Sequence, residues 1–145
     1  MFNFFSDYRL LLQKNTLKRS HLFLLASISW FIISTVLLTL PGTAFPTEDW
    51  LDKIWFDKWV HIGMFGLLVI LWCLAWKSLK QNEGTHNFVK AFWTIAILFI
   101  AYGIAMEFVQ KYFIPFRSFD VSDIAADIVG ATLGAFYSVR RYIKK

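Results

Sequence analysis

The sequence predicts an all-α membrane protein, a four-transmembrane-helix bundle with a short interfacial helix between the first and second spans. Hydrophobic residues make up 57% of the 145 residues, which is more apolar surface than a soluble domain of this length can bury. They gather in four runs, each long enough to cross the roughly 30 Å hydrocarbon core as a helix. Basic residues collect at the ends of these runs, as membrane topology requires.

Residues 1–20 form a basic segment ahead of the first span. Its charged residues are Arg9, Lys14, Lys18 and Arg19 against the single acid Asp7. Its Phe, Tyr and Leu residues recur at helical spacing, which predicts an amphipathic helix on the cytoplasmic membrane surface. A basic tail without regular structure is the alternative. The next run, residues 22–40, is too long for the apolar part of a signal peptide, so we expect a retained first span.

Pro41 and Gly42 end the first span. Thr47 is a suitable cap for a short helix with acids in its first turn, and the tryptophans at 50 and 55 give that helix an apolar face. Tryptophans beside a span favour the headgroup level, so we expect an interfacial helix. The remaining spans are expected at residues 58–76, 88–113 and 121–139. Residues 21–145 thus make one four-helix membrane domain.

The distribution of Lys and Arg predicts the orientation. Four lie in the N-terminal flank, three between residues 77 and 90, and four at the C-terminus, whereas the other two loops hold two each. Lys and Arg accumulate on the cytoplasmic side of membrane proteins. We therefore expect both termini and the middle loop in the cytoplasm, which agrees with an even number of spans.

Ionisable residues of three spans fall at similar depths. His61 lies three residues into the second span, Glu107 six residues before the end of the third, and Asp127 six residues into the fourth. Each lies toward the external end in the predicted topology. Ionisable groups inside a span are costly and usually functional, so these residues indicate a site.

Helical spacing groups further polar residues with these three. Asp57, Lys58 and His61 share a face, as do Glu107 and Gln110, and acids at positions 120, 123 and 127 form a stripe. Gly130 and Gly134 follow at four-residue spacing, which lets helix backbones approach closely, so we expect the fourth helix to be central.

Structural interpretations stand beside the functional ones. Asp120 is also a suitable helix cap, and Lys58 an interfacial lysine that reaches for water. His61 could be a buried histidine bonded to Asp57, and Glu107 could form a structural ion pair with Arg117.

Four motifs together resemble the VanZ-like family of small bacterial membrane proteins. They are Asp57-Lys58-x-x-His61, Gly103-x-x-x-Glu107-x-x-Gln110, Arg117-x-x-Asp120-x-x-Asp123 and Gly130-x-x-x-Gly134. One departure is Asp127, where many members are expected to have asparagine. The resemblance implies a multi-pass protein of the bacterial inner (cytoplasmic) membrane, and its founding member is associated with resistance to the lipoglycopeptide teicoplanin.

The first functional hypothesis is a protein that binds or modifies a lipid-linked or amphiphilic molecule, such as a lipoglycopeptide or a cell-wall lipid, at the outer leaflet. His61 and Glu107 would be the acid–base pair of any reaction, and Arg117 would hold an anionic headgroup. The predicted ligand-binding residues are Asp57, Lys58, Gln110, Arg117, Asp120, Asp123 and Asp127.

The second hypothesis is a non-enzymatic assembly or scaffold protein whose polar cluster only locks the helices. A proton- or ion-coupled carrier is disfavoured, because no comparable polar group lies in the cytoplasmic half of any span. The chain has no nucleophile motif, phosphate loop or strong metal-ligand spacing. We therefore expect no cofactor, no metal and no nucleic acid, with membrane lipids or an amphiphile as partner.

Overall fold

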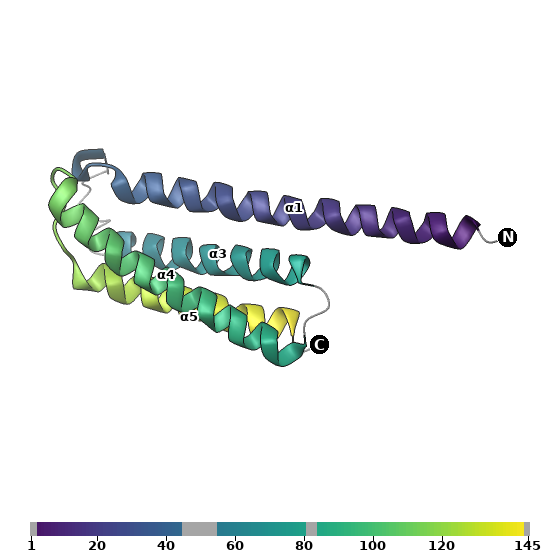
Figure 1. Cartoon of the computed structure of the whole chain (residues 1–145). Helices are drawn as coiled ribbons and strands as arrows, with labels where there is room; N and C mark the ends of the chain where they lie inside the picture. The colour runs from purple at the N-terminus through teal and green to yellow at the C-terminus, as the bar shows by residue number, and fades with distance from the viewer. Residues whose placement is uncertain (1–2, 45–54, 81–83, 144–145) are drawn as a thin grey trace.

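A computed structural model describes residues 3–44, 55–80 and 84–143, with the helix backbone alone for residues 3–16 and Lys18. Every regular element in this part of the chain is helical. In order they are α1 (Asn3–Thr39), the short 3-10 helix η1 (Gly42–Ala44), α3 (Phe56–Leu79), α4 (Thr85–Phe113) and α5 (Val121–Tyr142). Figure 1 shows α3, α4 and α5 packed together, with α1 running along them and extending beyond them at its N-terminal end.

Three helices are long and apolar enough to cross a membrane. These segments are Arg19–Thr39 within α1, Phe56–Leu79 and Thr85–Phe113. The all-α class with membrane-spanning helices is therefore confirmed. α5 is not among them, because its 22 residues include acids in the first half and two arginines in the last turn. A fourth crossing stays a prediction.

The N-terminal segment is helical but is not a separate element. α1 runs from Asn3 to Thr39 without a break, so neither a distinct surface helix nor a tail without regular structure is correct. The first proline or glycine after the N-terminus is Pro41, and nothing before it ends the helix. The predicted interfacial helix falls on residues 45–54, outside the described residues.

α1 joins the bundle through a stripe of small residues. Ser20, Ser27 and Ser34 are buried at seven-residue spacing, and each hydroxyl donates to a backbone carbonyl of the preceding turn. The most extensive contact of α1 is with α3. There, Trp30 Nε1 donates to the Met64 carbonyl oxygen at 3.2 Å.

The closest helix pair is α3 with α5. A Cβ atom at Gly130 would clash with the Ile62 carbonyl oxygen, and one at Gly134 would lie 2.6 Å from the Gly66 carbonyl oxygen. These two glycines therefore let the backbones approach, as their spacing predicts.

The position of the fourth helix differs from the prediction. α3 makes the most extensive contacts with the other helices, above all with α5 and α1, so α3 is the central helix. α5 leaves an exposed apolar face that includes Leu133 and Phe136. The buried core between the helices contains Phe65, Leu68 and Phe92 together with the small side chain of Cys73.

Candidate functional site

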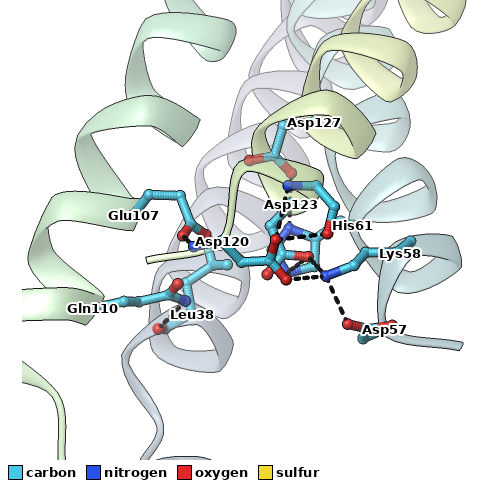
Figure 2. A network of polar contacts seen from close by, with 10 residues as sticks. Leu38, Asp57, Lys58, His61, Glu107, Gln110, Asp120, Asp123 and Asp127 are labelled. Atoms are coloured by element: carbon cyan, nitrogen blue, oxygen red, sulfur yellow. Dashed lines mark hydrogen bonds and ion pairs between the residues drawn. The ribbon is translucent and has the colours of Figure 1, made fainter. Parts of the chain in front are cut away.

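The ionisable side chains of the predicted site meet at one end of the bundle, where α3 and α5 begin and α4 ends. Figure 2 shows Lys58 and His61 of α3 facing acidic side chains of α5, with Glu107 of α4 close by. His61, Glu107 and Asp127 are all buried. The structure therefore brings together the three residues whose matched depths in the sequence indicated a site.

Lys58 lies at the centre of three carboxylates. Its Nζ is 2.8 Å from Asp57 Oδ2, 2.7 Å from Asp120 Oδ2 and 2.6 Å from Asp123 Oδ1. An ammonium group has three hydrogens, so these contacts use all of its donors. The side chain is 14% exposed. Lys58 is thus an internal counterion that joins α3 to the start of α5, not a lysine that reaches for the headgroups.

Asp120 caps α5, as its sequence position predicts. Its Oδ1 accepts hydrogen bonds from the Ser122 N–H at 2.8 Å and from the Ser122 hydroxyl at 2.6 Å. The Lys58 ammonium and these Ser122 donors lower the pKa of the Asp120 carboxyl to about 2, because each favours the ionised form. Asp120 therefore carries a full negative charge at neutral pH.

His61 is paired with Asp127. Its Nδ1 lies 2.8 Å from Asp127 Oδ1, and its Nε2 lies 3.9 Å from Asp123 Oδ1. The predicted bond to Asp57 is wrong, because Asp57 bonds Lys58 at the helix start and its side chain is 61% exposed. Residues four apart on a helix share a face, but His61 turns toward α5 instead.

Glu107 and Gln110 tie α4 to its neighbours. Glu107 Oε2 accepts the Asp120 N–H at 2.9 Å, and Gln110 Nε2 donates to the Leu38 carbonyl oxygen at 2.9 Å. Both side chains are buried. The hydrogen-bond partner of Glu107 is thus a backbone amide at the start of α5, and the suggested ion pair with Arg117 is wrong.

Arg117 lies in the connection between α4 and α5, which packs on the end of α1. Its Nε donates to the Leu40 carbonyl oxygen at 3.4 Å. The Gly42 N–H donates to the Pro115 carbonyl oxygen at 3.3 Å, and a Cβ atom at Gly42 would clash with the Phe116 backbone. The turn after α1 and the turn after α4 therefore hold each other in place.

A pocket of about 380 Å³ opens between these turns and the first turns of α3 and α5. Its polar lining consists of Asp57, His61, Arg117, Ser118, Asp120 and Asp123. Its apolar lining includes Leu37, Leu38, Phe56, Val60, Met64 and Phe116. Four of the predicted site residues, Lys58, Glu107, Gln110 and Asp127, do not line it.

The sequence profile of the VanZ/LLP1 family matches residues 1–141. The chain belongs to this family. The match confirms the resemblance seen in the four motifs, and it covers α1, α3, α4 and all but the last residue of α5. Searches of curated proteins and of solved structures found no match.

The VanZ/LLP1 chain also uses polar contacts that its sequence did not reveal. The Leu38 and Leu40 carbonyl oxygens are acceptors for Gln110 and Arg117, and Thr35 Oγ1 lies 2.9 Å from Tyr102 OH. Every residue has a backbone carbonyl oxygen, so the sequence does not show which ones accept side-chain hydrogen bonds. The Thr35–Tyr102 pair could have been suspected, because buried tyrosine hydroxyls usually find a partner.

The acidic cluster of this VanZ/LLP1 protein surrounds a cationic side chain, the ammonium group of Lys58. Oxygens of Asp57, Asp120 and Asp123 lie within 4.8 Å of one another, the spacing of a metal site. Lys58 Nζ bonds all three carboxylates. A divalent ion would have to displace this ammonium, so the carboxylates are better explained as its counterions.

Proposed function

We propose that this VanZ/LLP1 protein is a four-span protein of the bacterial cytoplasmic membrane that binds an amphiphilic or lipid-linked molecule at the outer end of its helix bundle. The observation that carries the proposal is the pocket, which combines a charged wall with an apolar wall. Ligand sites in proteins typically combine apolar walls with a few placed polar groups.

The lining suits a molecule with a polar head and an apolar chain. Leu37 and Leu38 of α1 and Val60 and Met64 of α3 offer contact to the chain. Arg117 offers a positive charge beside the headgroup. The pocket is built from helix ends and turns, where a membrane protein meets the headgroup layer.

The fourth crossing is part of the proposal. At about 1.5 Å per residue, the 22 residues of α5 extend roughly 33 Å, enough for the hydrocarbon core. The acids that lower its hydropathy, Asp123 and Asp127, are buried against the bundle, whereas Val129, Leu133 and Phe136 are exposed. Buried acids do not face lipid, so α5 can cross despite its composition.

The test compares two valine positions of similar exposure. Val60 lines the pocket and is 42% exposed, whereas Val129 of α5 is 46% exposed and lies outside the pocket lining. Each is replaced by tryptophan, and the amphiphiles that co-purify with the wild-type protein and both variants are identified by mass spectrometry. We expect at least one species to be retained by the wild type and Val129→Trp but to fall by about tenfold or more in Val60→Trp. Equal lipid content in all three proteins would contradict the proposal.

A non-enzymatic assembly role is the second candidate. It is favoured by the hydrogen bonds that several site residues make to other elements. Lys58 bonds Asp123 of α5, Gln110 bonds the Leu38 carbonyl oxygen of α1, and Glu107 accepts the Asp120 N–H. Glu107→Gln, Arg117→Gln and His61→Gln separate the two roles. Full complementation of a deletion strain's cell-envelope phenotype by all three variants would leave only the assembly role.

A further inference from the structure

The His61 ring stands between a buried carboxylate and the pocket. Its Nδ1 is 2.8 Å from Asp127 Oδ1, and Asp127 is 2% exposed. His61 lines the pocket, and its Nε2 is 3.9 Å from Asp123 Oδ1, beyond hydrogen-bond distance. Within the described residues, the ring therefore has a hydrogen bond on one nitrogen only.

The carboxylate decides which nitrogen carries the hydrogen. An ionised carboxylate can only accept hydrogen bonds, so when Asp127 is ionised Nδ1 donates to it. In the neutral ring the remaining nitrogen, Nε2, then has a free lone pair. A buried acid that fixes a histidine tautomer in this way is a common arrangement for proton transfer.

Three helices are shaped to hold this pair. A Cβ atom at Gly103 of α4 would lie 2.5 Å from Asp127 Oδ2, so a glycine there leaves room for the carboxylate. A Cβ atom at Gly130, three residues beyond Asp127 on α5, would clash with the carbonyl of Ile62, the residue after His61. The close approach of α3 and α5 thus sets the distance between ring and carboxylate.

We infer that His61 is the proton-transfer residue of the pocket and that Asp127 is its positioning residue. His61 Nε2 accepts a proton from a hydroxyl group or water held in the pocket, the ring becomes an imidazolium, and the proton returns from Nε2 when the ring is restored. Asp127 at Nδ1 and Asp123 near Nε2 stabilise the imidazolium charge. The inference rests on the proposed function because proton transfer needs a molecule bound in the pocket.

This assignment replaces the acid–base pair that the sequence suggested. Glu107 bonds the Asp120 N–H and does not line the pocket, so it is not placed to exchange a proton with an occupant. The ionisable groups near the ring come from every element packed against it. They are Asp57 and Lys58 of α3, Glu107 of α4, Arg117 and Asp120 of the connection, and Asp123 and Asp127 of α5, with Tyr102 of α4 near Asp127.

The tautomer is measured directly by nitrogen NMR on protein labelled with ¹⁵N-histidine. The chain has three histidines, and His61→Gln assigns the signal. Between about pH 5 and pH 10, which brackets an ordinary histidine, we expect the ring to titrate and its neutral form to keep the hydrogen on Nδ1. Asp127→Ala should lose that preference, and Asp127→Asn should restore it, because an amide oxygen also accepts from Nδ1.

A neutral ring that carries its hydrogen on Nε2, or a ring that does not titrate in this range, would overturn the inference. The wild-type spectrum decides this even if Asp127→Ala does not fold. A purely structural pair would hold the same tautomer, so access to Nε2 from the pocket is measured as well.

Access to Nε2 is tested with diethyl pyrocarbonate, which modifies an unprotonated imidazole nitrogen. We expect His61 to be modified in the wild type and at least about tenfold more slowly in Val60→Trp, with the exposed His86 as the internal control. Equal modification of His61 in both proteins, or none in the wild type, would overturn the inference. Neither experiment needs a bound amphiphile, so a failure of the proposed function would be seen separately.

Discussion

Glu107 is the most completely buried acid of the site, with 1% of the residue exposed. Its one hydrogen bond within the described residues is from the Asp120 N–H, at the point where the chain enters α5. The first N–H groups of a helix have no partner within the helix, so side-chain acceptors often satisfy them. Glu107 therefore fixes the start of α5 from the end of α4.

This geometry predicts different results for two substitutions of Glu107. Glu107→Gln should keep the stability, because the amide oxygen can accept the same hydrogen bond. Glu107→Leu should lose about 1–3 kcal/mol, because the Asp120 N–H is then left without its acceptor. Thermal unfolding in detergent measures both. Equal stability of the two variants would show that the Asp120 N–H has another acceptor.

Asp120 predicts a pH dependence of stability. The pKa of its carboxyl is lowered to about 2 in the folded protein, chiefly by Lys58, from an ordinary value of about 3.9. A lowered folded pKa stabilises the fold above the ordinary value, and this contribution is lost as the pH falls through the folded pKa. The stabilisation from Asp120 should thus be complete above about pH 4 and disappear toward about pH 2.

The measurement is the melting temperature of wild type and Asp120→Asn across this range. Asparagine is also a good helix cap, so the variant removes the charge and keeps the cap. We expect the wild type to melt higher near neutral pH and the difference to shrink below about pH 4. A melting-temperature difference that stays constant down to about pH 2 would show that it arises from helix capping and not from the charge of Asp120.

The contact between α3 and α5 depends on glycine, and the same bundle offers a matched control. A Cβ atom at Gly130 would clash with the Ile62 carbonyl oxygen, whereas one at Gly63 would meet nothing within 4 Å. Gly130→Ala should destabilise the bundle by about 1–3 kcal/mol or more, because backbone must move. Gly63→Ala should be neutral or stabilising by up to about 1 kcal/mol, because alanine favours a helix. Equal melting temperatures of the two variants would mean that the close approach of α3 and α5 does not contribute to the stability.

Much of this packing was predictable from the sequence, but the pairing of side chains was not. The apolar runs located the four helices, the residue type ahead of the last run indicated the Asp120 cap, and the glycine spacing predicted the close approach at Gly130. It placed Asp57 and His61 on one face, yet it could not show that His61 turns toward Asp127 while Asp57 remains exposed. Partners on other helices depend on how the helices are rotated against one another, and periodicity within one helix does not contain that information.

The continuous α1 could have been predicted, because residues 3–39 contain no proline or glycine. The change from basic to apolar composition instead predicts two separate segments. A change of composition along a helix changes its surroundings, not its backbone, so a helix can continue from an aqueous into an apolar environment.

The molecule as a whole places its site and its chain termini at opposite ends. Figure 1 shows the start of α1 and the end of α5 at one end, and the turns after α1 and α4 at the other. Four crossings would produce this arrangement, with both termini on one side of the membrane. The excess of Lys and Arg at the terminal side predicts a cytoplasmic location for this side, as proposed above.

This topology is tested by single cysteines in a Cys73→Ala background, since Cys73 is the only cysteine. Ser118→Cys lies between α4 and α5, Thr85→Cys at the start of α4, and Ile143→Cys after the end of α5. We expect an impermeant maleimide added to intact cells to label position 118, and to label positions 85 and 143 only after the membrane is opened. Positions 118 and 143 flank α5 alone, so their comparison tests the fourth crossing. Labelling of both from outside would show that α5 does not cross, and labelling of 85 and 143 but not 118 would reverse the orientation and place the pocket in the cytoplasm.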